Sequence, residues 1–271
     1  MDRSPILLGI VNITEDSFSD GGRYLTTDAA ISHAKKLHAD GAVIVDLGAA
    51  ASNPKAKPIA TADEIARLAP VVAALKQEKI AVSIDTFSSA VQSWALAEDV
   101  DYLNDIHGFS DPTLYPALAA GKARLIVMHA VQTEGRATPV ETMPQEIMGR
   151  ILRFFETRIA KLEQAGIARS RLILDPGMGF FLGREPQVSF EVLRHLPDLK
   201  RAFGLPILIS VSRKSFLRTM TKRSPAEAGP ATLAAELFAV YQGADYIRTH
   251  DPAALSDGLA VWAAATTRNT V

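Results

Sequence analysis

The sequence predicts an α/β protein, a single-domain TIM (β/α)₈ barrel over residues 1–271. Eight short apolar segments alternate with eight longer amphipathic segments from one end of the chain to the other. The apolar segments are rich in Ile, Val and Leu, as strands buried on both faces are. The length of 271 residues fits a barrel of roughly 250 residues. A doubly wound open sheet is the competing arrangement.

The expected strands lie in chain order at 6–11, 42–47, 81–85, 102–104, 124–128, 172–175, 207–210 and 246–249. Each precedes a segment whose apolar residues recur at helical spacing. These expected helices lie at 27–39, 61–77, 88–97, 112–120, 144–165, 186–202, 230–242 and 252–267. Several of them begin with Pro or follow Ser, Thr or Asp, which favour helix starts. Gly41, Gly166 and Gly243 follow helices, where glycine commonly stands.

Composition narrows the class of protein. The formal net charge is −1, which gives no electrostatic reason to expect nucleic acid or a membrane surface as a partner. The chain has no cysteine, so disulfides and thiolate metal sites are excluded. The sequence shows no signal-peptide pattern and no apolar run of about 18 residues, the length that crosses a bilayer. We therefore expect a cytoplasmic location.

Polar residues end nearly every expected strand. Active sites of such barrels form at the carboxyl ends of the strands, so these residues should meet on one rim. In chain order they are Asn12, Asp46, Asp85, Asn104, Asp105, His129, Asp175, Ser212, Arg213, Lys214, Arg248 and His250. Acids and amides that converge on one rim predict a polar ligand.

The cations follow the last two strands. Arg213 and Lys214 come after the seventh strand, and Arg248 and His250 close the eighth. Barrels of this type often bind phosphate in the loops after these two strands, so the pattern favours a phosphate or diphosphate. A surface cluster of ion pairs is the alternative.

The carboxylates belong to other strands. Asp85 and Asp175 end the third and sixth strands, and Asn104 ends the fourth. Two acids and an amide suit a heterocycle with N–H donors beside a carbonyl, because a carboxylate accepts two such bonds side by side. The alternative is that each acid caps the helix that follows it.

The polar rim suggests two kinds of metal site. A zinc site would draw on His107, His129 and His250, but the first strand ends at Asn12 without a histidine. A Mg²⁺ ion carried by phosphates, with Asn12 as its protein ligand, suits the oxygen-rich rim better.

Six segments together resemble the dihydropteroate synthase family over essentially the whole chain. They are Gly9-Ile10-Val11-Asn12-Ile13-Thr14-Glu15-Asp16-Ser17-Phe18-Ser19-Asp20-Gly21-Gly22, Ser83-Ile84-Asp85-Thr86, Leu103-Asn104-Asp105-Ile106, Leu174-Asp175-Pro176-Gly177-Met178-Gly179-Phe180, Ser212-Arg213-Lys214-Ser215 and Arg248-Thr249-His250-Asp251. Each alone is a weak signal, whereas all six in order, each at a strand end, are highly specific.

The resemblance implies a reaction and its residues. An amine, p-aminobenzoate, displaces diphosphate from the CH₂ group of a dihydropterin, with Asp85, Asp175 and Lys214 as catalytic residues. Asp85, Asn104, Asp175 and Lys214 should hold the pterin. Asn12, Arg248 and His250 should hold the diphosphate, with Asn12 on Mg²⁺. Ser52, Phe180, Phe181, Ser212 and Arg213 should border the p-aminobenzoate.

Two departures resemble the mobile, plasmid-type sulfonamide-resistant synthases. The second loop reads Ala51-Ser52-Asn53-Pro54 where the family usually has Ser-Thr-Arg-Pro, and Phe181-Leu182 replaces a Gly-Lys pair. A bulkier Phe181 or a shifted Phe180 would clash with a sulfonamide while admitting the smaller carboxylate of p-aminobenzoate. A clash of about 1–3 kcal/mol costs roughly 10–200-fold in affinity. The alternative is that Phe181 is buried packing.

The resemblance also implies small-molecule substrates and a homodimer formed through late barrel helices. The apolar faces at 233–241 and 255–265 are compatible with such a dimer. The competing functions are a pterin-binding methyltransferase barrel, a drug-sensitive housekeeping synthase and a non-catalytic pterin-binding protein.

Overall fold

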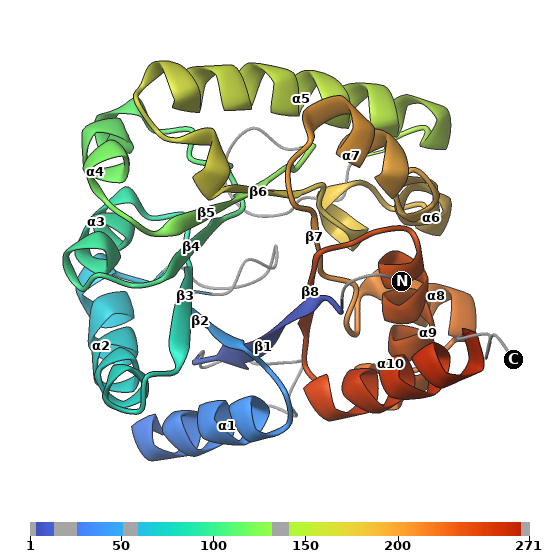
Figure 1. The fold of residues 1–271 in the computed structure, drawn as a ribbon, viewed down its shortest axis with the longest axis horizontal. Coiled ribbons are helices and arrows are strands. Elements are labelled where there is room, and N and C mark those ends of the chain that lie inside the picture. The colour runs from blue at the N-terminus through green and yellow to red at the C-terminus, as the bar shows by residue number, and fades with distance from the viewer. Residues whose placement is uncertain (1–3, 14–25, 51–58, 132–140, 267–271) are drawn as a thin grey trace, which may run out of the picture.

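The protein, as a computed structural model, is described over residues 4–13, 26–50, 59–131 and 141–266. A ring of parallel strands lies inside a ring of helices (Figure 1). The strands are β1 (Ile6–Asn12), β2 (Ile44–Gly48), β3 (Ala81–Asp85), β4 (Tyr102–Asp105), β5 (Arg124–Met128), β6 (Leu172–Asp175), β7 (Leu208–Ile209) and β8 (Tyr246–Thr249). Their order is β6-β5-β4-β3-β2-β1-β8-β7, and a bridge between Leu174 and Ile207 joins the two ends. The predicted barrel is confirmed.

Helices cover the outside of the strands. They are α1 (Thr27–Ala39), α2 (Thr61–Gln77), α3 (Ser89–Ala97), α4 (Tyr115–Ala120), α5 (Pro144–Gln164), α6 (Pro186–Arg194), α7 (Leu196–Phe203), α8 (Ser215–Thr221), α9 (Gly229–Tyr241) and α10 (Pro252–Thr266). Thr26 and Ser88 cap α1 and α3, where their side chains accept backbone N–H bonds.

Three expected elements differ from the structure. The helix predicted at 112–120 begins as a 3₁₀ helix at Pro112–Leu114 and is α-helical only from Tyr115. The helix predicted at 186–202 is two helices, because Pro197 has no N–H to continue the hydrogen bonds of α6 and the chain turns at His195. The strand predicted at 207–210 is reduced to Leu208–Ile209. At its start, the Ile207 amide bonds to the Asp245 carboxylate at 2.9 Å rather than to a ladder partner.

The barrel interior has an apolar floor. Side chains from six strands form this inner cluster, which is separate from the larger core between strands and helices: Leu8, Ile44, Ile126, Ile173, Leu208 and Tyr246. Side chains in a strand alternate between faces, so the residue two positions further along also points inward. That spacing places Asp46, Asp175 and Arg248 above the floor, towards the carboxyl ends of the strands.

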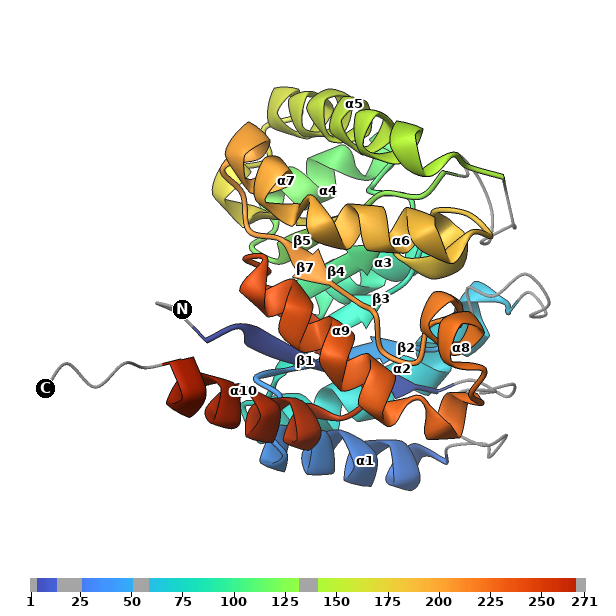
Figure 2. The ribbon, with the colours of Figure 1, turned by 90° about the vertical axis from the view of Figure 1, so that its right-hand side faces the viewer.

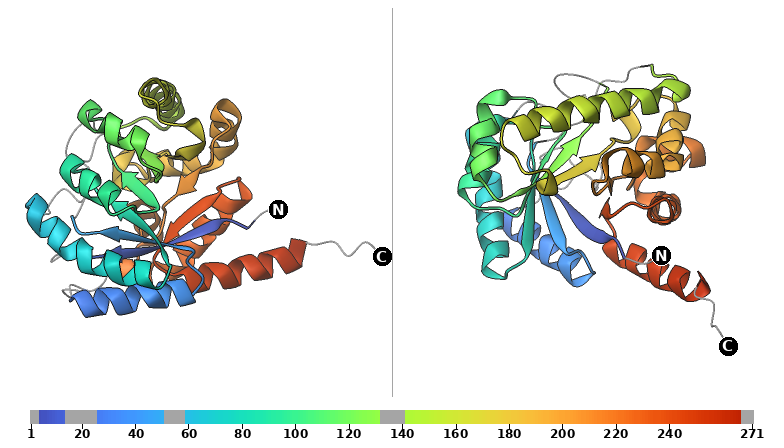
Figure 3. Two further views of the ribbon diagram at one scale, coloured as in Figure 1. Left: turned by 60° about the vertical axis from the view of Figure 1, so that its left-hand side comes forward. Right: turned by 45° about the horizontal axis from the view of Figure 1, so that its top comes forward.

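The two ends of the barrel are distinct. Figure 2 shows α8 at one end, while β1 begins and α10 finishes at the other end. Figure 3 shows the ring of helices around the strands from two further sides. The end that carries α8 is therefore the carboxyl end of the strands. Within the described residues, no helix combines the length and apolar character needed to cross a membrane.

Candidate active site

Arg248 lies at the centre of the carboxyl end. Its Nε donates to Asp46 Oδ2, and its Nη2 donates to Asp85 Oδ2 at 2.6 Å. The two acids come from β2 and β3, and the cation comes from β8. Arg248 of the eighth strand and Asp85 of the third strand therefore lie at the same mouth of the barrel.

Asp175 is fixed by the loop that follows β6. Its Oδ1 accepts the Gly177 N–H at 2.8 Å. Gly177 has a φ of +77°, and a Cβ there would lie 2.3 Å from the His129 carbonyl oxygen, so only glycine fits. The His129 ring is buried and its Nδ1 lies 3.1 Å from the Pro176 carbonyl oxygen. The loop thus holds the carboxylate in one orientation.

Lys214 approaches the same acids from the loop between β7 and α8. Its Nζ lies 5.0 Å from the centre of the Phe181 ring, a cation–π contact. Its side chain also runs past Gly179, where a Cβ would come within 3.4 Å of the lysine Cδ. Phe180, the next residue, is 41% exposed.

His250 and Ser212 form a second polar pair at the mouth. The Ser212 Oγ lies 2.9 Å from His250 Nδ1 and accepts the His250 backbone N–H at 3.2 Å. Between Ser212 and Lys214, Arg213 has a φ of +56°, and its backbone N–H donates to Thr232 Oγ1 at 3.0 Å. This bond fixes the turn that carries both cations.

Asn12 and Asn104 complete the arrangement. A Cβ on Gly48 would lie 3.8 Å from Asn12 Oδ1 and 3.7 Å from Asp85 Cβ, so Asn12 borders the same space as Asp85. Asn104 pairs in register with Asp85 on the next strand and is 4% exposed. Its Oδ1 is buried without a hydrogen-bond partner among the described residues.

Burial shifts the pKa of each central group towards its neutral form. It raises the pKa of Asp85 to about 7, opposed by Arg248 and reinforced by Asp46. It also raises the pKa of Asp175 to about 6, opposed by the Gly177 N–H and Lys214. It lowers the pKa of Lys214 to about 8, opposed by Asp175. Groups poised this close to neutral pH are typical of functional sites.

The pKa values of His250 and Arg248 shift for different reasons. Burial, with Arg213 and Arg248, holds the pKa of His250 well below its usual range, so the ring is neutral at pH 7. Burial acts to lower the pKa of Arg248, but Asp46 and Asp85 raise it above its ordinary value. Arg248 is therefore a permanent cation beside a neutral imidazole.

Most of the expected site residues share this mouth, and one important neighbour was missed. Ser52 and Asn53 lie outside the described residues. The sequence marks Asp46 only as a strand end, although it is fully buried against Arg248. Counting two residues from the apolar Ile44 would have placed it inward. Among the described residues, no group of three or more His, Asp or Glu side chains is placed to hold a metal ion.

Known proteins match the chain along nearly its full length. The family of pterin binding enzymes matches residues 8–250. A dihydropteroate synthase type-2 of Escherichia coli is 57% identical, and the match covers 97% of each chain. The chain belongs to the dihydropteroate synthases. The resemblance that the motifs predicted, including that to the plasmid-type group, is confirmed.

Solved structures of this family share the fold. A dihydropteroate synthase of Xanthomonas albilineans with 4-aminobenzoic acid has a TM-score of 0.87 and 34% identity, covering 98% of this chain and 94% of the other. The same enzyme in complex with 7,8-dihydropteroate has a TM-score of 0.82 and 30% identity, with the same coverage. These matches to synthases do not favour the alternative function, a pterin-binding methyltransferase barrel.

Proposed function

We propose that this synthase condenses 6-hydroxymethyl-7,8-dihydropterin diphosphate with p-aminobenzoate, giving 7,8-dihydropteroate and diphosphate. One observation carries the proposal: Arg248 of β8 is within hydrogen-bond distance of Asp85 of β3 at the mouth of the barrel. The charges of Lys214 and Asp175 also interact there. A single site thus offers carboxylates to a heterocycle and cations to its leaving group.

Asp85, Asn104, Asp175 and Lys214 form the proposed pterin half. Asn104 Oδ1 has no partner among the described residues, so it is suited to accept a ligand N–H. Asp175 keeps one oxygen on Gly177 and can offer the other to the amino group of the ring. The two acids would stabilise positive charge that develops on the pterin CH₂ more than they stabilise the neutral substrate.

Arg248, His250 and Asn12 form the proposed diphosphate half. Charge grows on the leaving diphosphate, and fixed cations at that place speed its departure. Neutral His250 bonds to Ser212 through Nδ1, which leaves Nε2 on the other side of the ring. We infer that Nε2 faces a phosphate oxygen and that the anion favours protonation of the ring.

Mg²⁺ fits this half of the site through one protein ligand. Asn12 Oδ1 is an oxygen donor at the mouth, and Mg²⁺ prefers oxygen ligands and retains several waters. The diphosphate and water would supply the other ligands. The bound ion would neutralise charge on the leaving group.

Phe180, Phe181, Ser212 and Arg213 border the space that we assign to p-aminobenzoate. The Phe181 ring is held against Lys214, which the proposal places on the pterin, so Phe181 lies where the two substrates would meet. We infer that its bulk excludes the larger group of a sulfonamide.

Replacing Phe181 with alanine is expected to lower the inhibition constant of a sulfonamide about 10–200-fold, because the clash is removed. The KM for p-aminobenzoate should change much less. Inhibition of pyrophosphate release by sulfamethoxazole measures both values. The exposed Phe180 is the comparison: an equal gain in drug sensitivity for Phe180→Ala with none for Phe181→Ala would assign the clash to Phe180.

Pyrophosphate release tests the reaction itself. The purified chain should release pyrophosphate only when the pterin diphosphate, p-aminobenzoate and Mg²⁺ are all present. Asp85→Ala should abolish that release. Release by the wild type without the amine, or full activity in the variant, would contradict the proposed roles.

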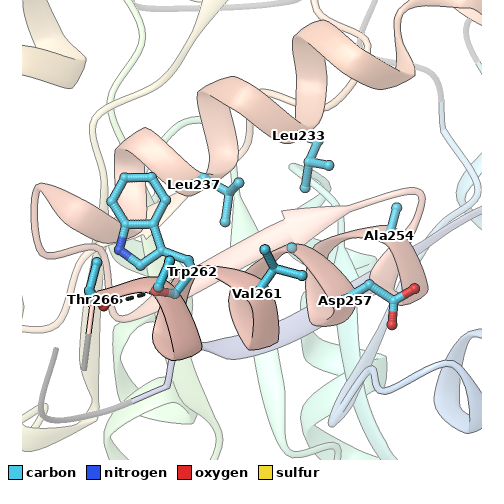
Figure 4. Close-up of a pocket in the computed structure, with 9 residues that line it drawn as sticks. Leu233, Leu237, Ala254, Asp257, Val261, Trp262 and Thr266 are labelled. Carbon is cyan, nitrogen blue, oxygen red and sulfur yellow. Dashed lines mark hydrogen bonds between the residues drawn. The ribbon is translucent and has the colours of Figure 1, made fainter. Parts of the chain in front are cut away.

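We also infer a homodimer through α9 and α10, the helices that the sequence singled out. An apolar groove between them is lined by Leu233, Leu237, Val261 and Trp262, as Figure 4 shows. Val261 is 69% exposed and Tyr241 is 62% exposed at its edge. Exposed apolar patches of this kind mark association surfaces.

Val261→Asp is expected to convert the dimer to a monomer, because a charge would be buried at the apolar contact. Light scattering after size-exclusion chromatography measures the mass. Val43→Asp is a matched control, since Val43 is 55% exposed but lies immediately before β2. A wild-type chain that elutes as a monomer at micromolar concentration would refute the dimer.

A cytoplasmic location and a single domain over 1–271 remain predictions.

A further inference from the structure

Asp46 is a buried carboxylate for which the proposed reaction has no direct use. Its side chain has 0% exposure and lies two residues beyond Ile44 of the apolar floor. Arg248 stands in the same relation to Tyr246 on β8, and only β1 separates the two strands. The alternation of strand side chains therefore brings both charged groups to the interior at the same depth.

Arg248 divides one edge of its guanidinium between two unequal partners. Its Nε meets Asp46, which is sealed from solvent, and its Nη2 meets Asp85, whose side chain is 22% exposed. Nη1 takes part in neither ion pair. Asp85 is thus the partner that a ligand can reach, and Asp46 is the one that it cannot.

Stability alone does not account for the buried pair. Two buried charges cost desolvation that their attraction often fails to offset, and apolar replacements of such pairs are frequently neutral or stabilising. In addition, Asp46 Oδ1 has no hydrogen-bond partner among the described residues. The burial of the Asp46 carboxylate is better explained by its effect on the position of Arg248.

We propose that Asp46 is a positioning residue that anchors Arg248, so that Asp85 can be released to the pterin while the guanidinium remains in place for the diphosphate. This inference rests on the proposed function. When the pterin N–H groups take Asp85, Arg248 keeps one ionic partner and needs no new orientation. Without Asp46, Arg248 would have Asp85 as its carboxylate partner and would compete with the pterin for it.

The test is Asp46→Asn, which keeps the shape and removes the charge. The KM for the pterin diphosphate should rise about 10–100-fold, as expected when a binding group is displaced by a distance near 1 Å. Calorimetric titration with the dihydropterin alone should show the same loss, while kcat at saturation changes less. An unchanged KM together with unchanged dihydropterin binding would overturn the inference.

The pH profile gives a readout that lost packing would not move. In the wild type the charged groups acting on Asp85 are Arg248, Asp46, Lys214 and Asp105. The negative charge of Asp46 raises the pKa of Asp85. Its removal lowers that pKa and strengthens the pairing of Asp85 with Arg248. The acidic limb of kcat/KM should therefore move to lower pH, and an unmoved limb would contradict the anchor.

Three variants complete the design. Asp245→Asn is the matched control: it removes another carboxylate–cation pair, with Lys200 at 2.7 Å, from the opposite end of the barrel. In an Arg248→Met background, Asp46→Asn should cause no further rise in KM, and a second full rise would refute action through Arg248. If Asp46→Asn is unfolded by circular dichroism, Asp46→Glu lengthens the anchor and should still raise KM.

The wild type separates the two proposals. Failure of the wild type to release pyrophosphate would remove the proposed function. A normal wild type with Asp46 variants that behave like Asp245→Asn would remove only the anchor.

Discussion

Replacing Asp175 with asparagine is expected to lower kcat/KM for the pterin diphosphate about a thousandfold while the fold becomes no less stable. The carboxylate accepts from the Gly177 N–H and faces Lys214, in the place proposed for the pterin amino group. An amide keeps the first bond and the shape but loses the charge that stabilises a developing pterin cation. Loss of one such electrostatic contact costs about 100–1000-fold in rate.

The stability part of this prediction follows from the sign of the pKa shift. Burial raises the pKa of Asp175 to about 6, above its ordinary value of 3.8, so the folded state binds this proton more tightly than the unfolded state. The ionised side chain therefore destabilises the fold above pH 6, and this cost disappears as the pH falls below the unfolded value. The amide should raise the free energy of unfolding by about 1–3 kcal/mol at pH 7.5 and should leave it unchanged near pH 3.

Steady-state pyrophosphate release and thermal melting at the two pH values measure these effects. Asp101→Asn is the control, because Asp101 also accepts a backbone N–H, from Val82 at 2.9 Å, but is exposed at the other end of the barrel. An Asp175→Asn protein that is fully active, or that melts below the wild type at pH 7.5, would contradict this account.

Replacing Lys214 with methionine is expected to lower kcat/KM about 100–1000-fold and to remove the alkaline limb of its pH profile. Burial lowers the pKa of Lys214 to about 8, so the wild type should lose its cation, and with it activity, as the pH rises through that value. Methionine has a similar length and can retain the contact with Phe181, since its sulfur also packs well on rings.

Lys222→Met is the matched control for Lys214, because it removes one positive charge from an exposed position at the end of α8. It should leave both the rate and the alkaline limb unchanged. If the alkaline limb persists in Lys214→Met, the limb belongs to another group, and Lys214 has no part in the reaction.

The barrel was predictable from sequence because the buried strands are short apolar runs, and a polar residue ends or follows nearly every one of them. Strand limits at 81–85, 124–128, 172–175 and 246–249 agree with the structure. Pro197 signals the break between α6 and α7, although it stands inside an otherwise helical pattern. The shortening of β7 had no local signal, and the carboxylate that binds the Ile207 amide, that of Asp245, lies in another segment.

The site was predictable as a set of residues but not as a set of partners. Strand ends and family motifs predict Arg248 as a cation for the diphosphate, yet nothing in the sequence says that it pairs with Asp46 and Asp85. Those pairs depend on the order of strands around the barrel, because β8 lies beside β1 and near β2. The inward position of Asp46 follows from the alternation of side chains along a strand. Its pairing with Arg248 can be foreseen only once the strands are known to close into a ring.

A crystal structure with 7,8-dihydropteroate and pyrophosphate bound tests most directly whether one mouth holds both halves of the reaction. We expect the pterin N–H groups to bind Asp85 and Asp175, and the pyrophosphate to lie against Arg248 and His250. Arg248 should still touch Asp46. A pterin bound away from Asp85 and Asp175, or a pyrophosphate on another surface of the barrel, would contradict a shared mouth.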